Sequence, residues 1–138
     1  MTTHVAILRP RYIDLVLDGA KTIEARLSVC RIAPFGIVAT GDELFLRAGA
    51  SGYAARASVG RIWSFDRLTP GLVRELRKKF EPRVRGGSAF WKAKRSAQFA
   101  TFIELRNVQE TARGPPLVRK AGDRRAWFAM DSTISKAA

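Results

Sequence analysis

The run "GAKTIEARL", residues 19–27, places three charged side chains, Lys21, Glu24 and Arg26, in a strand-like segment. In an extended chain, alternation would put Lys21 on one face and Glu24 with Arg26 on the other. A Glu–Arg pair on one face presents planar donors to a phosphate or to a base edge. The same pair could instead be a structural ion pair, or a set of solvated charges on an edge strand. The run therefore predicts either a polar binding site or a purely structural contact.

The chain has a large excess of positive charge, with 25 Lys and Arg residues against 12 Asp and Glu residues and a net charge of +13. Such an excess favours polyanionic partners, because neutralised phosphates release their condensed counterions. The excess is concentrated in residues 74–95, which carry a local net charge of +7. A generic basic surface would have the same composition. The residues predicted to contact a nucleic-acid backbone here are Lys78, Lys79, Arg83 and Arg85.

The rare residue types limit the chemistry. Cys30 is the only cysteine and His4 the only histidine, which excludes disulfide frameworks, zinc clusters and catalytic triads built on further partners. We therefore expect no metal and no cofactor. No apolar run is long enough to span a membrane and the N-terminus lacks the pattern of a signal peptide, so the expected location is cytoplasmic, with no membrane partner.

The hydrophobic pattern predicts several short strands with helices inserted between them. Thr69 is the expected cap of a helix with a buried stripe of Leu72, Val73, Leu76 and Phe80 and a Glu75–Lys79 pair. A bend is expected at Gly60. The predicted strands are residues 4–9, 21–27, 42–48, 52–65, 98–108 and 125–130; the predicted helices start at Pro10, Pro70 and Ser88, and residues 81–88 are expected to form a hinge. This pattern indicates an α+β fold, a small, mainly antiparallel β-barrel with peripheral helices.

The stretch "ILRPRYIDLVLDGAKTIEARL", followed by "APFG" and "GDELFLR", resembles the ASCH domain family of the PUA-like superfamily. The family signature GxKxxExR corresponds to Gly19, Lys21, Glu24 and Arg26. The resemblance spans residues 4–108 and extends to 123–130, which predicts one PUA-like domain over residues 1–130 and a disordered tail over 131–138. It implies a compact barrel with a cleft beside the signature strand that binds RNA or a modified nucleotide.

The resemblance also implies two enzymatic alternatives. Some family members are amidohydrolases that deacetylate N4-acetylcytidine with a lysine, a threonine and a later glutamate, and others are reported to be ribonucleases. Lys21 matches the lysine, Glu24 stands at the threonine position, and Glu75 and Glu81 are both candidates for the later glutamate. Lys21 and Glu24 would thus be catalytic only if the protein is an enzyme. We expect activity on N4-acetylcytidine to be absent or much weaker than binding.

Aromatic residues near the basic segment are candidates for base stacking. Phe90 and Trp91 follow the glycine-containing hinge, whereas Trp63 lies in an apolar strand and is expected in the core. The leading prediction is a binding module for RNA, a nucleotide or single-stranded nucleic acid, in which Lys21, Glu24, Arg26, Tyr12, Phe90 and Trp91 line the cleft. An adaptor that binds an acidic protein through its basic helix is the remaining alternative.

Overall fold

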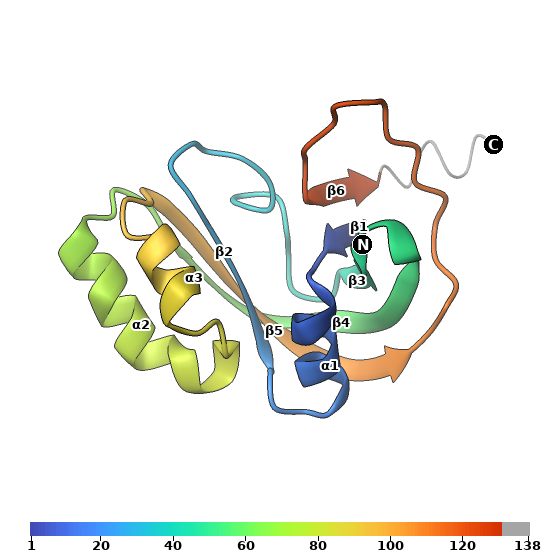
Figure 1. Ribbon diagram of the computed structural model, residues 1–138, viewed down its shortest axis with the longest axis horizontal. Helices are drawn as coiled ribbons and strands as arrows, with labels where there is room; N and C mark the ends of the chain where they lie inside the picture. The colour runs from blue at the N-terminus through green and yellow to red at the C-terminus, as the bar shows by residue number, and fades with distance from the viewer. Residues whose placement is uncertain (131–138) are drawn as a thin grey trace.

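The computed structural model describes residues 1–130, with the side chain of Ala50 excepted, so the tail predicted at 131–138 lies outside the described residues (Figure 1). Within residues 1–130, no helix is long and apolar enough to cross a lipid bilayer. The elements in chain order are β1 (Thr3–Ile7), α1 (Pro10–Leu17), β2 (Ile23–Ser28), β3 (Glu43–Arg47), the short 3₁₀ helix η1 (Gly49–Ser51), β4 (Tyr53–Phe65), α2 (Pro70–Val84), α3 (Ser88–Ala93), β5 (Phe99–Glu110) and β6 (Trp127–Met130).

The six strands form one curled sheet in the order β2-β5-β4-β3-β1-β6. Every pairing is antiparallel except that of β1 with β3. The sheet curves into a half-barrel and the helices lie around it, which confirms the predicted α+β fold. The register of β4 against β5 shifts between Val59 and Ile62, so the bend predicted at Gly60 is also confirmed.

Helix α1 begins with Pro10 at its first position, where the missing N–H costs no hydrogen bond. The helix ends before Gly19, whose φ of +84° reverses the chain at low steric cost. Two residues later, Lys21 precedes the start of β2 at Ile23. The signature lysine therefore belongs to the turn rather than to the strand.

Helix α2 begins at its predicted cap, because the Oγ1 of Thr69 accepts a hydrogen bond from the backbone N–H of Leu72. The predicted hinge at residues 81–88 is wrong in its first half. The helix continues through Pro82 to Val84, because the buried stripe formed by Val73, Leu76 and Phe80 continues to Val84 with helical spacing.

Two further predictions about α2 are wrong. Leu72 is 48% exposed, since it lies off the buried stripe. Glu75 pairs with Lys78, at 3.3 Å, rather than with Lys79. Both three- and four-residue spacings bring helix side chains together, and the sequence alone does not choose between them.

The core has two parts. One packs α1 against the inner residues of β1, β3, β4 and β5, and includes Ile13, Val16 and Leu46. The other packs α2 and α3 against β2 and β5, and its centre is the stacked pair of Phe80 and Phe102, with ring centroids 4.1 Å apart. Figure 1 shows α1 on one side of β2 and α3 on the other, so the signature strand lies between these two helices.

Candidate functional site

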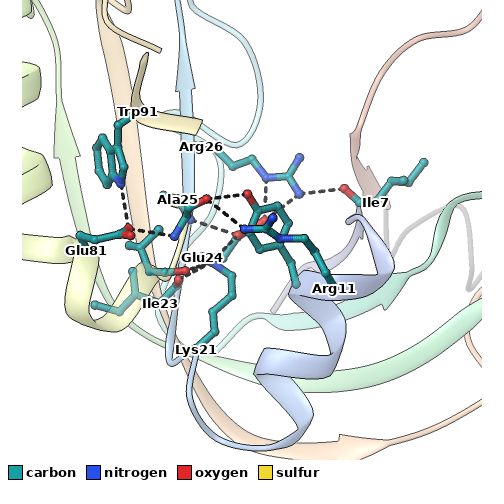
Figure 2. Close-up of polar contacts among 12 residues, drawn as sticks. Ile7, Arg11, Lys21, Ile23, Glu24, Ala25, Arg26, Glu81 and Trp91 are labelled. Atoms are coloured by element: carbon teal, nitrogen blue, oxygen red, sulfur yellow. Dashed lines mark hydrogen bonds and ion pairs between the residues drawn. The ribbon is translucent and has the colours of Figure 1, made fainter. Parts of the chain in front are cut away.

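Glu24 is the centre of a charged network on β2. Its side chain is almost fully buried, and its Oε1 lies 3.2 Å from the Nζ of Lys21. Its Oε2 accepts hydrogen bonds from the Nε and Nη2 of Arg26, at 3.0 and 2.8 Å (Figure 2). Burial by itself would raise the pKa of Glu24, but the charges and hydrogen bonds of Lys21 and Arg26 outweigh it and lower that pKa. We call Lys21, Glu24 and Arg26 the Glu24 network.

Lys21 is buried, with 3% of its surface exposed. Besides pairing with Glu24, its Nζ donates to the carbonyl oxygens of Ile23, at 2.9 Å, and Val84, at 2.7 Å. All three ammonium hydrogens thus have an acceptor within the protein. The prediction that Lys21 and Glu24 point to opposite faces is wrong, because strict alternation begins only at Ile23.

Arg26 joins the two edges of the curled sheet. Its Nη2 donates to the carbonyl of Ile7 at the end of β1, and its Nη1 to that of Ala126 just before β6, at 3.0 and 3.3 Å. The guanidinium carbon also lies 5.4 Å from the centre of the Trp127 ring. The predicted Glu24–Arg26 pair is therefore present, and it also holds the half-barrel together.

Glu81 organises the loop that forms one wall beside the network. Its carboxylate accepts hydrogen bonds from the backbone N–H groups of Gly86 and Gly87 and from the indole of Trp91, at 2.8 to 2.9 Å (Figure 2). Burial would raise the pKa of Glu81, but these hydrogen bonds lower it. On the other side of the loop, the Tyr12 hydroxyl donates to the carbonyl of Gly86 at 2.8 Å.

A cleft of about 640 Å³ opens above the Glu24 network, between α1, α3 and the Gly86–Gly87 loop. Tyr12 and Phe90 are its aromatic walls. Its border carries three further cations, Arg9, Arg11 and Lys94, which we call the rim cations. Within residues 1–130, no rim cation has a carboxylate partner.

The electrostatics of the cleft are strongly positive. Burial and the nearby positive charge of Arg26 both lower the pKa of Lys94. A cation that is partly desolvated beside another cation is stabilised by any anion that approaches both. The arrangement can therefore bind a negatively charged group, whereas its own carboxylate is fully engaged.

The structure brings five of the predicted cleft residues together: Lys21, Glu24, Arg26, Tyr12 and Phe90 all line the cleft. Trp91 does not face it. Its side chain is 3% exposed, packs near Phe102 and donates to Glu81, so Phe90 is the member of that aromatic pair that borders the cleft.

The other predicted residues lie elsewhere. Lys78, Lys79, Arg83 and Arg85 are exposed on α2 and just after it, and none of them lines the cleft. Neither candidate for the later glutamate lines the cleft. Glu75 is exposed beside Lys78, and Glu81 supports the Gly86–Gly87 loop.

Sequence reasoning missed the rim cations as site residues. Arg9 and Arg11 flank Pro10, the residue that starts α1, so their position beside the signature strand could have been inferred from the strand–helix–strand order. Lys94 belongs to the basic segment, where no sequence signal separates it from its neighbours.

Comparisons with known proteins identify the fold. No protein-family model and no curated protein match the chain. Structures of the ASCH protein from Zymomonas mobilis do resemble it. The unmutated protein is 18% identical, with a TM-score of 0.61 over 78% of this chain and 69% of that one. A point mutant of the same protein is 17% identical, with a TM-score of 0.68 over 98% of this chain and 92% of that one.

The fold and the site therefore define a small α+β half-barrel protein with a charged cleft beside β2. The chain has the fold of ASCH domain proteins, and this confirms the fold that the resemblance implies.

Proposed function

We propose that this ASCH-fold protein binds RNA or a nucleotide, with one nucleotide seated in the cleft above the Glu24 network. The observation that carries the proposal is the set of three rim cations without a carboxylate partner in residues 1–130, placed around two aromatic walls. A nucleotide combines an anion with a flat π surface, and the cleft offers a complement to each.

The positive charge of the cleft favours an anionic ligand over a neutral one. Among residues 1–130, five cations and a single carboxylate line the cleft, and the carboxylate is already neutralised within the Glu24 network. Burial and the charge of Arg26 both lower the pKa of Lys94, and a phosphate between the two cations would relieve their mutual repulsion. The cations are Arg9, Arg11, Lys21, Arg26 and Lys94.

Size and shape fit one nucleotide. The volume of about 640 Å³ lies within the range of small-ligand sites, about 300 to 1,000 Å³. Tyr12 is held by its hydrogen bond to Gly86, and Phe90 packs against the same loop, since a Cβ on Gly86 would lie 2.6 Å from its ring. Two aromatic side chains positioned in this way offer a base a preorganised stacking surface.

The basic face of α2 supplies the second part of the proposal. Lys78, Lys79, Arg83 and Arg85 are exposed outside the cleft and would contact the backbone of a longer RNA without regard to sequence. Such contacts raise affinity and make it depend on salt.

Catalysis has less support than binding. A lysine that acts as a base or nucleophile needs a free lone pair, whereas the Nζ of Lys21 is surrounded by three acceptors. The single histidine, His4, is buried, and it bonds to Asp42 and Trp127 rather than facing the cleft. Absent or very weak activity on N4-acetylcytidine therefore remains our prediction.

Calorimetric titration with the four nucleoside monophosphates and the matching nucleosides tests the proposal. Monophosphates should bind more tightly than nucleosides, and Arg11→Ala or Lys94→Ala should weaken the monophosphate about tenfold, as expected for one lost charged hydrogen bond. Arg113→Ala, an exposed arginine that does not line the cleft, is the control with the same loss of charge.

Binding of a short single-stranded RNA, measured by fluorescence anisotropy over a salt series, tests the basic face. Replacing Lys78, Lys79, Arg83 and Arg85 together by alanine should weaken all sequences alike and lower the salt slope by about 0.7 for each lost phosphate contact. No binding of nucleotides or RNA at low salt would refute the proposed function.

A further inference from the structure

A second hollow, of about 280 Å³, lies next to the cleft on the far side of Arg26. Arg26, Leu27 and Lys94 line both hollows, so they form the ridge between them. Besides residues 26–28 of β2 and Lys94, the walls of the second hollow come from three segments far apart in the sequence: the loop at residues 32–35, the start of β5, and residues 124–127 leading into β6.

The second hollow has a largely aromatic and apolar lining. Phe35 and Phe99 meet edge to face, with ring centroids 5.1 Å apart, and Trp127 forms a further part of the wall. Phe35 and Phe99 are both partly exposed and so remain accessible to a ligand. A flat, uncharged group such as a nucleobase is the ligand that this lining suits.

The edge of the second hollow is positively charged. Arg124 is exposed and, within residues 1–130, has no carboxylate partner. The neighbouring Arg125 differs, because it pairs with Asp123 at 2.9 Å. Arg124 is thus the cation at this edge that remains available to a phosphate.

A buried hydroxyl in the wall is an independent sign of a ligand. Thr101 is 1% exposed, and its Oγ1 has no hydrogen-bond partner among the described residues. Thr101 pairs with Arg26 in the β2–β5 register, so the two side chains lie on the same face of the sheet. Buried hydroxyls are usually satisfied, and Thr101 is one of the residues that line the second hollow beside the ridge.

We propose that the second hollow binds the adjacent nucleotide of a single-stranded RNA, so that the preferred ligand spans at least two nucleotides. One base occupies the cleft, the base on its 5′ side lies against Phe35 and Phe99 with its own 5′-phosphate beside Arg124, and the phosphodiester between the two nucleotides crosses the ridge at Arg26 and Lys94. The inference rests on the proposed function and sharpens it, because a free nucleotide would occupy only one hollow.

The test compares nucleoside monophosphates with the corresponding 5′-phosphorylated dinucleotides, in uridine and adenosine series, by calorimetric titration. The dinucleotide should bind about tenfold more tightly, because it adds one stacked base. Phe35→Ala should remove this gain and leave the affinity for the monophosphate unchanged. Arg124→Glu should do the same, whereas Arg113→Glu, with the same charge change outside both hollows, should preserve the gain.

The outcomes separate the two proposals. If monophosphates bind but dinucleotides bind no more tightly, or if Phe35→Ala and Arg124→Glu leave the gain intact, the second subsite is refuted and the proposed function stands. If Arg113→Glu abolishes the gain as fully as Arg124→Glu, the effect is general charge and the subsite is again refuted. If neither ligand binds, the proposed function itself fails.

Discussion

Replacing Glu24 by glutamine should destabilise the fold strongly, because the carboxylate neutralises two cations at once. Lys21 is 3% exposed, so its buried ammonium group would lose its acidic partner. An amide of the same shape also turns N–H donors toward Lys21 or Arg26, which are themselves donors. Removing one member of a buried ion pair costs about 3 to 5 kcal/mol, and we take about 3 kcal/mol because the amide oxygen still accepts.

Urea unfolding and thermal unfolding at neutral pH, both followed by tryptophan fluorescence, measure this loss. At about 4 °C per kcal/mol for a domain of this size, the melting temperature should fall by about 12 °C. Glu75→Gln is the matched control, since Glu75 pairs with Lys78 in solvent, with its side chain 67% exposed. That pair should contribute less than about 0.5 kcal/mol.

The same variant should also change how stability depends on pH. The pKa of Glu24 is lower in the folded state than its ordinary value of 4.5, so the unfolded chain takes up the proton first as pH falls. The stabilisation is complete above the unfolded pKa and is lost as pH falls through the folded one. Glu24→Gln should therefore lose less stability than the wild type on acidification. Part of the pH dependence of the unfolding free energy should persist in this variant, because the pKa values of Asp42 and Glu81 are also lowered in the folded state. A variant within about 1 kcal/mol of wild type at neutral pH, or an unchanged acid slope, would refute the reasoning.

Two further substitutions test the walls of the two hollows. Thr101→Val should raise the free energy of unfolding by about 1 kcal/mol in urea unfolding, because it removes a buried hydroxyl without a partner in the described chain. A decrease in the free energy of unfolding of about the same size would show instead that the hydroxyl is satisfied. Gly86→Ala should destabilise by about 1 to 3 kcal/mol and weaken nucleotide binding, since the new Cβ would lie 2.6 Å from the Phe90 ring. Gly71→Ala, whose Cβ would meet nothing closer than 3.6 Å, should leave binding unchanged in the same titration, and equal effects of the two alanines would contradict the steric argument.

The sequence alone determined much of the fold, because the decisive signals are local. Pro10 and Gly19 delimit α1, Thr69 caps α2, and Gly60 marks the bend in β4. Each acts through backbone conformation or a hydrogen bond within a few residues. The Glu24–Arg26 pair was predictable for the same reason, since a two-residue spacing on a strand fixes which side chains share a face.

Only the tertiary structure decided what these residues do together. Lys21 meets Glu24 because β2 starts after it, and Val84, 63 residues away in the chain, supplies one of its acceptors. Trp91 is buried and Phe90 borders the cleft, although both belong to the same short helix. The two hollows and their ridge arise where strands and loops distant in sequence converge. Spacing along the chain predicts contacts within an element, whereas the packing of elements decides which charges are neutralised and which remain available to a ligand.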